Sequence, residues 1–435
     1  MCCVLKKVLL DVQRRVNMQL NKIEKINLEV KLDIPNILLM IFSICVLLSN
    51  LTPIPGLFGN ALIAGCGCLL FIYTILYKKD DKRIWWVVLL AIMLSFCLIL
   101  SSMYNHNASI KEVLWIWSYM GAALALVSFE IDSRWVSVLF YVLAGYFFLC
   151  IIMRRSVHYI LYSTSRNGIS LLMIFMALLL YVCRKSNQMK IVYLPATFNL
   201  IISVWALGRA GIFTAVFFWC GIAIYGLVVE KGKNCKELLE NIGLLVIAMF
   251  LLVGVFPTNE SLYLEKKNTI EMDSASINKK IEQNIPENKN GMVQPKNETF
   301  ISRFSEYGLK SVRINIWSEY LEKTLDSGKN LFLGVDCSTG KYLGTYKQPH
   351  NSYLELHAKF GIIGFIIVMT LLIKTFFLLY REREWLWLII FITCAIRAML
   401  DWVAFPGSID VIFWFLILKN ILMKRESKKL HLKKV

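Results

Sequence analysis

The sequence predicts an all-α polytopic membrane protein with about 12 transmembrane helices and one large extracytoplasmic loop between helices 9 and 10. Of its 435 residues, 57% are hydrophobic and 18% are charged, which is too apolar for soluble domains to hide inside their cores. A helix needs about 20 mainly apolar residues to cross a bilayer, and the chain contains twelve runs near that length. The Lys and Arg residues between these runs are also distributed unevenly.

The twelve apolar runs set the expected order of elements. They cover residues 34–51, 57–77, 84–104, 113–129, 135–153, 167–183, 191–207, 210–229, 241–257, 360–380, 385–405 and 408–423. The first nine runs contain no Lys, Arg, Asp or Glu. The sixth and ninth are barely long enough to cross, so the sequence allows 11 to 13 spans.

The orientation follows from the positive charges, because Lys and Arg are retained on the cytoplasmic side of a membrane. With twelve spans and both termini inside, the cytoplasmic segments carry 26 Lys and Arg residues and the short outer connections carry 5. The same basic inner face, lying beside anionic lipid, explains most of the net charge of +18. Nucleic acid is therefore not an expected partner.

Five segments follow from this topology. Residues 1–33 lack the residue order of a signal peptide, and their spaced apolar positions predict a cytoplasmic amphipathic segment that anchors the chain or binds a partner. Residues 34–257 carry helices 1–9, residues 360–423 carry helices 10–12, and residues 424–435 form a basic cytoplasmic tail. Residues 258–359 form the extracytoplasmic loop, whose first part is polar and typical of a flexible segment.

The second part of the loop contains a predicted amphipathic helix in "YGLKSVRINIWSEYLEKTLDSGK". The apolar residues that recur at helical spacing are Leu309, Val312, Ile316, Trp317, Tyr320, Leu321 and Leu325. Ser327 and Gly328 supply a stop signal. Arg313 shares the apolar face, where a charge needs an anionic partner. An ordinary ion pair or a side chain that extends to water would also explain Arg313.

Other polar residues gather on the same predicted side of the membrane. Arg209 follows "WALG" in a very short connection, and Asp401 lies near the outer end of the eleventh span, one turn beyond Arg397. Arg209 could be a headgroup anchor, and Arg397 with Asp401 could neutralise each other at i and i+4. Ionisable groups in spans are nevertheless candidates for function.

"QPHNSYLELHAKFGIIGF" leads into the tenth span and brings His350 and Asn351 to the same side. His357 shares their face if the helix has already started there. A histidine at this position could be an ordinary interface residue. Together with Arg166 and the charged residues above, the set predicts an anion-binding cavity with acid/base capacity at the outer leaflet.

This stretch resembles the C-terminal signature of the bacterial O-antigen polymerase and O-antigen ligase superfamily. That signature has a His-Asn-x-Tyr-Leu element and then Gly-x-x-Gly at the start of a span, as in "PHNSYLELHAKFGIIGF", with an Arg-x-x-x-Trp helix upstream, as in "VRINIW", followed by "FLGV". The short "GRAG" resembles the inter-span arginine of the family. In "GVDCSTG", Asp336 stands where the family often has a second glycine.

The resemblance implies a fold of the membrane glycosyltransferase type called GT-C and a place in the bacterial cytoplasmic membrane. Its substrates would be oligosaccharides linked through pyrophosphate to a polyprenyl lipid, and neither a metal ion nor another cofactor would be needed. Arg209 and Arg313 would bind the pyrophosphate, since guanidinium groups bind phosphate oxygens bidentately. His350 would position or deprotonate the acceptor hydroxyl. The implied substrate-binding residues are Arg166, Asn351, Tyr353, His357 and Asp401.

Three functions remain open at this point. A polymerase would join lipid-linked repeat units into an O-antigen, a capsule or an exopolysaccharide. A ligase would pass the glycan to a lipid or surface acceptor. A flippase is less well supported, because the first nine spans carry no charge and the chain shows no internal repeat. For either enzyme the expected partners are the lipid-linked oligosaccharide, membrane lipids, a flippase and a chain-length regulator.

Overall fold

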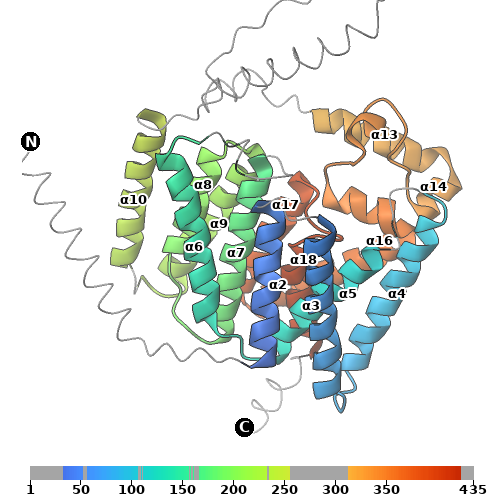
Figure 1. The fold of residues 1–435 in the computed structure, drawn as a ribbon, viewed down its shortest axis with the longest axis horizontal. Coiled ribbons are helices and arrows are strands. Elements are labelled where there is room, and N and C mark those ends of the chain that lie inside the picture. The colour runs from blue at the N-terminus through green and yellow to red at the C-terminus, as the bar shows by residue number, and fades with distance from the viewer. Residues whose placement is uncertain are drawn as a thin grey trace, which may run out of the picture. The chain divides into compact units, whose positions relative to one another are not determined.

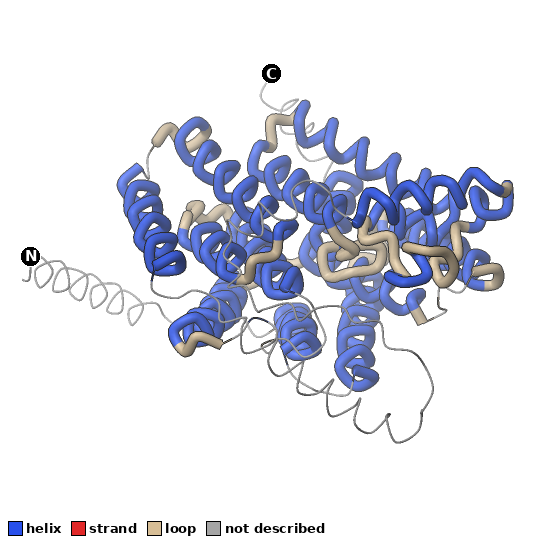
Figure 2. Tube along the Cα trace, turned by 90° about the horizontal axis from the view of Figure 1, so that it is seen from above, coloured by secondary structure: helices blue, strands red, loops and turns tan. Residues whose placement is uncertain are grey.

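The computed structural model describes residues 33–51, 56–105, 109, 111–155, 157, 160, 166–232, 235–254 and 312–422. Helices and connecting loops account for these residues (Figures 1 and 2). The helices belong to one compact unit, Ile34–Val435. Except for Asp33, the predicted N-terminal segment lies outside the described residues, as do the first part of the long loop and the basic tail.

Each of the twelve predicted spans coincides with one helix of the described residues. In chain order these are α2 (Ile34–Leu51), α3 (Gly56–Tyr77), α4 (Ile84–Ser102), α5 (Glu112–Ser128), α6 (Ser133–Ile152), α7 (Arg166–Ser186), α8 (Leu194–Trp205), α9 (Arg209–Val228), α10 (Cys235–Gly254), α16 (Ser352–Arg381), α17 (Trp385–Leu400) and α18 (Asp410–Leu422). Among the described residues, seven helices are long and apolar enough to cross a membrane, and α5, α8 and α17 are shorter apolar helices. By helix length and hydropathy the chain is a multi-pass membrane protein.

Helix α16 is broken at Gly361, which has φ +62° and ψ −175°. Only glycine adopts this backbone conformation readily, and an added Cβ would lie 2.2 Å from the carbonyl oxygen of Phe332. The break separates a short first helix, beginning at Ser352, from the long apolar part that ends at Arg381. The predicted tenth span began at residue 360, so it corresponds to this second part.

Three helices lie in the described part of the long loop: α13 (Val312–Asp326), α14 (Gly328–Leu333) and α15 (Leu343–Tyr346). Figure 1 shows α13 and α14 beside the start of α16 and the end of α4. Asn105 fixes this arrangement, since its Nδ2 donates to the carbonyl oxygens of Leu333 at 2.9 Å and Ala358 at 3.0 Å. The side chain of Asn105 therefore holds the end of α14 and the first part of α16 beside the end of α4.

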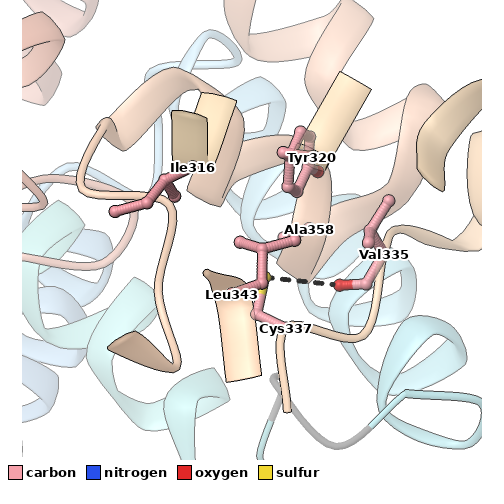
Figure 3. Close-up of a cluster of buried hydrophobic side chains, with 6 residues drawn as sticks. All are labelled: Ile316, Tyr320, Val335, Cys337, Leu343 and Ala358. Atoms are coloured by element: carbon pink, nitrogen blue, oxygen red, sulfur yellow. Dashed lines mark hydrogen bonds between the residues drawn. The ribbon is translucent and has the colours of Figure 1, made fainter. Parts of the chain in front are cut away.

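A small hydrophobic core fills the space under α13. Figure 3 shows its side chains gathered around one centre: Ile316, Tyr320, Val335, Cys337, Leu343 and Ala358. The predicted helix in this region is confirmed and ends at Asp326, where expected. The predicted apolar stripe is too wide, however, because Leu321 is 52% and Leu325 80% exposed. The buried face is limited to the side that meets α16 and the following loop.

Candidate functional site

His350 stands in the turn that precedes α16. Its φ of 48° places it outside the helix, and Asn351 is the N-cap, whose Oδ1 accepts from the backbone N–H groups of Tyr353 at 2.9 Å and Leu354 at 3.3 Å. The imidazole is partly exposed, and its Nδ1 lies 3.9 Å from Oδ1 of Asp401. This distance allows an ion pair but is too long for a direct hydrogen bond.

Asp401 follows the last residue of α17 and connects the charged groups of the site. Its Oδ2 lies 3.5 Å from Nη2 of Arg397, and its Oδ1 accepts from the N–H of Trp402 at 3.0 Å. Burial alone would raise the pKa of the Asp401 carboxyl. The nearby His350 ring and the guanidinium groups of Arg397 and Arg313 outweigh burial and lower this pKa below its ordinary value. Asp401 is therefore ionised near neutral pH.

Arg313 approaches the end of α17 from the long loop. It lies in the first turn of α13, and its Nη1 donates to the carbonyl oxygen of Leu400. Burial lowers the pKa of this guanidinium, the charge of Asp401 raises it, and the charge of Arg209 lowers it again. Arg313 is thus close enough to interact electrostatically with both of the other predicted residues, Asp401 and Arg209.

Arg209 is the first residue of α9 and is exposed. Its position depends on the close approach of α9 to the start of α7, since a Cβ at Gly208 would lie 2.5 Å from Oδ1 of Asn167. Arg166 begins α7 at this same end, and its side chain lies outside the described part of the chain. The backbone therefore brings both predicted arginines to one end of the helices.

Arg397 is a part of the site that the sequence did not single out as a site residue. Its side chain is 1% exposed, and its Nη2 donates to the carbonyl oxygen of Asn167 at 2.9 Å. Among the described residues its Nε and Nη1 have no hydrogen-bond partner. The i, i+4 spacing to Asp401 predicted the ion pair, but nothing in the sequence indicated the contact with α7.

The sequence also did not indicate the role of Ser352, whose side chain stabilises the turn that contains Asp401. Its Oγ donates to the carbonyl oxygen of Asp401 at 2.8 Å and accepts from the N–H groups of Val403 at 2.9 Å and Ala404 at 3.1 Å. Tyr353 supports the same region, because its hydroxyl donates to the carbonyl oxygen of Ala395 at 3.2 Å. These contacts join the start of α16 to the end of α17.

His357 is 6% exposed and contacts other parts of the protein with both ring nitrogens. Nε2 lies 2.8 Å from the carbonyl oxygen of Leu331, and Nδ1 lies 2.7 Å from the hydroxyl of Tyr320. A carbonyl oxygen can only accept, so Nε2 carries the proton and Nδ1 accepts from the tyrosine. The structure gives His357 a packing role between α13, α14 and α16.

The arrangement can bind an anion and transfer a proton. The guanidinium groups of Arg397 and Arg313 interact with the carboxylate of Asp401. That carboxylate faces the imidazole of His350. Within the described residues, no group of three or more His, Cys, Asp or Glu side chains is placed to hold a metal ion. The positive charge of this site comes from arginine.

Comparison with protein-family models, with curated proteins and with solved structures gives no match. The function must therefore be argued from the chemistry of the site.

Proposed function

We propose that the protein is a membrane-embedded glycosyltransferase that joins polyprenyl-pyrophosphate-linked oligosaccharide repeat units into a surface polysaccharide. The observation that carries this proposal is the cluster of Arg209, Arg313, Asp401 and His350 at one end of the helices. Residues from four separate parts of the chain contribute to it. Such convergence of an anion-binding pair with a potential base is typical of a catalytic site.

The proposed topology has twelve spans, a GT-C-like fold, and both termini in the cytoplasm of a bacterium. The loop of residues 258–359 and the cluster then face the outside of the cytoplasmic membrane. The distribution of Lys and Arg supports this orientation. The seven long apolar helices among the described residues support a multi-pass arrangement.

In the proposed reaction, a sugar hydroxyl of the acceptor attacks the anomeric carbon of the donor glycan. The bond from this carbon to the pyrophosphate oxygen breaks, and the polyprenyl pyrophosphate leaves with the bonding electrons. Arg209 and Arg313 stabilise the negative charge that develops on the leaving group. Nδ1 of His350 faces Asp401, so Nε2 is the nitrogen that accepts the hydroxyl proton.

The supporting residues divide between substrate binding and architecture. Asn351 and Tyr353 shape the site through the cap of α16 and its contact with α17. Arg166 is proposed to bind substrate from the start of α7. His357, which the family resemblance placed among the substrate-binding residues, is better explained by its two contacts with the protein.

A ligase is the second candidate, because the same cluster would serve transfer to a lipid or surface acceptor. A flippase is less favoured, since the charged side chains of the cluster lie at the ends of α9, α13 and α17. Transporters commonly bind their substrates near the middle of the membrane.

The test uses purified protein and a synthetic lipid-linked repeat unit, with and without a separate lipid acceptor. We expect His350→Ala to reduce glycan transfer at least about a hundredfold, the lower range for loss of a general base. Thr345→Ala, an exposed change in α15, serves as the matched control. Retained transfer in His350→Ala would contradict the proposed role. The acceptor that receives the glycan distinguishes polymerase from ligase.

A further inference from the structure

A cavity lies at the opposite ends of helices that carry the proposed site. This inner cavity has a volume of about 700 Å³ and is lined by the end of α7, the end of α18, the start of α17 and neighbouring turns. Glu230, just beyond α9, lines it, whereas Arg209 begins α9. A helix of this length is about 30 Å long. The inner cavity is therefore separate from the site of His350.

The inner cavity has charges of both signs in its lining. Its charged residues are Lys185, Lys190, Lys419, Glu130, Glu230 and Glu384. Lys419 of α18 and Lys185 of α7 are close enough for their positive charges to oppose each other, whereas Glu384 attracts Lys419. A ligand that carries a single sign of charge would meet repulsion from part of this lining. A ligand with a negative and a positive group would match it.

Aromatic side chains form one wall of the inner cavity. The rings of Trp387 and Phe415 have centroids 5.3 Å apart, and both residues line the cavity. Nζ of Lys419 lies 5.3 Å from the centre of the Trp387 ring, a distance suited to a cation–π interaction. The ammonium group of Lys419 is thus held at this wall.

An apolar groove of about 400 Å³ lies between α9 and α17 next to the inner cavity. Val229 of the groove precedes Glu230 of the cavity, and Trp385 of the groove follows Glu384 of the cavity. Charged and apolar surfaces therefore adjoin at the same helix ends. A soluble ligand would use only the charged part, whereas a lipid would use both.

We propose that the inner cavity binds the headgroup of a phospholipid that carries a phosphate and a primary ammonium, as phosphatidylethanolamine does. The phosphate is bound by Lys185 and Lys419, and the ammonium group is bound by Glu384. An acyl chain of the same lipid lies in the groove between α9 and α17. The proposal depends on the inner cavity and the adjoining groove, and it holds whether or not the protein transfers sugars.

The test measures lipid binding to the purified full chain by native mass spectrometry. Phosphatidylethanolamine, phosphatidylcholine, phosphatidylglycerol and soluble phosphoethanolamine are compared. We expect phosphatidylethanolamine to bind most tightly. Lys185→Gln/Lys419→Gln should weaken this binding about thirtyfold, because each lysine beside an anionic lipid headgroup contributes about fivefold in affinity, the equivalent of about 1 kcal/mol.

The matched control is Lys79→Gln/Lys82→Gln, which removes the same charge from exposed positions between α3 and α4. This control should bind like the wild type. Glu384→Gln is a milder second variant that should lose the preference for phosphatidylethanolamine over phosphatidylglycerol. Equal binding of all three lipids, or unchanged binding in the double variant, would overturn the proposal. Phosphoethanolamine that competes as well as the lipid would overturn the role of the groove.

Discussion

Arg397 controls the charge and the position of Asp401, the residue that links the arginines of the site to His350. Its guanidinium is almost fully buried and lies between the Asp401 carboxylate and the backbone of α7. Removal of one partner from a buried ion pair leaves the other charge without compensation. The effect of Arg397 on the site is therefore indirect and electrostatic.

We predict that Arg397→Leu destabilises the protein by about 3–5 kcal/mol, the usual cost of breaking a buried pair. The pKa of Asp401 is lowered in the folded state, so its stabilising effect is present above the unfolded pKa and is lost as pH falls through the folded pKa. Without Arg397 this pKa rises, and the acidic limb of the pH profile of the proposed sugar transfer moves to higher pH. An unchanged acidic limb would contradict this role. Arg397→Lys, which keeps the charge, is the control.

Only the structure distinguishes the role of His350 from that of His357. His350 and His357 both lie in the motif that carries the family resemblance, and the sequence favoured a site role for each. The N-cap at Asn351 puts His350 outside α16, whereas His357 lies inside it and contacts Tyr320 and Leu331. Those partners are distant in the chain, so no local pattern could reveal them.

Among the helices, the break in α16 sets the direction of its first part relative to its long apolar part. Gly361 turns the chain, and its backbone lies against Phe332 at the end of α14. Because the first part of α16 carries Ser352 and Tyr353, the break also sets how the turn at Asp401 is held.

We predict that Gly361→Ala destabilises the protein by at least about 1–3 kcal/mol, because alanine is strained at φ +62° and its Cβ meets a carbonyl oxygen. Gly145→Ala is the control, since Gly145 lies in α6 with nothing within 4 Å of an added Cβ. Thermal unfolding in detergent measures both variants. Equal thermal stability of Gly361→Ala and Gly145→Ala would show that position 361 accepts a side chain.

The positions of the helices were largely predictable from the sequence, but their local details were not. Long apolar runs located all twelve helices, because the bilayer requires that length, but individual ends differ by up to eight residues, as at the start of α16. The break at Gly361 was not predicted, since "FGIIGF" also fits an unbroken helix. The exposure of Leu321 and Leu325 was missed because helical spacing does not show how much of a face is covered.

For the molecule as a whole, the main prediction concerns the two ends of the helices. His350 and Asp401 lie at one end of α17, and the inner cavity lies at the other. If the proposed orientation is correct, these ends face opposite compartments.

We predict that Lys341→Cys reacts with a membrane-impermeant maleimide in sealed right-side-out vesicles, and that Ser186→Cys reacts only after permeabilisation. Both positions are exposed, the first in the long loop and the second at the end of α7. Cys220 and Cys235, which are exposed, are replaced by serine in the background chain. The reverse pattern would invert the topology, and equal reaction at both positions in sealed vesicles would place them on one side.

The buried contact of Glu112 with Lys359 has a consequence for the synthesis of the protein. Nζ of Lys359 lies 2.9 Å from Oε1 of Glu112 and 3.1 Å from Oε1 of Glu355, and Glu112 and Lys359 are 247 residues apart. At about 5–20 residues per second, a ribosome needs roughly 12 to 50 s to make the intervening chain. During that interval the nascent protein contains Glu112 without Lys359, the lysine that pairs with it. Until α16 is made, Glu112 avoids a buried unpaired charge only by contact with water or by protonation. The final packing of an early helix therefore waits for a late one.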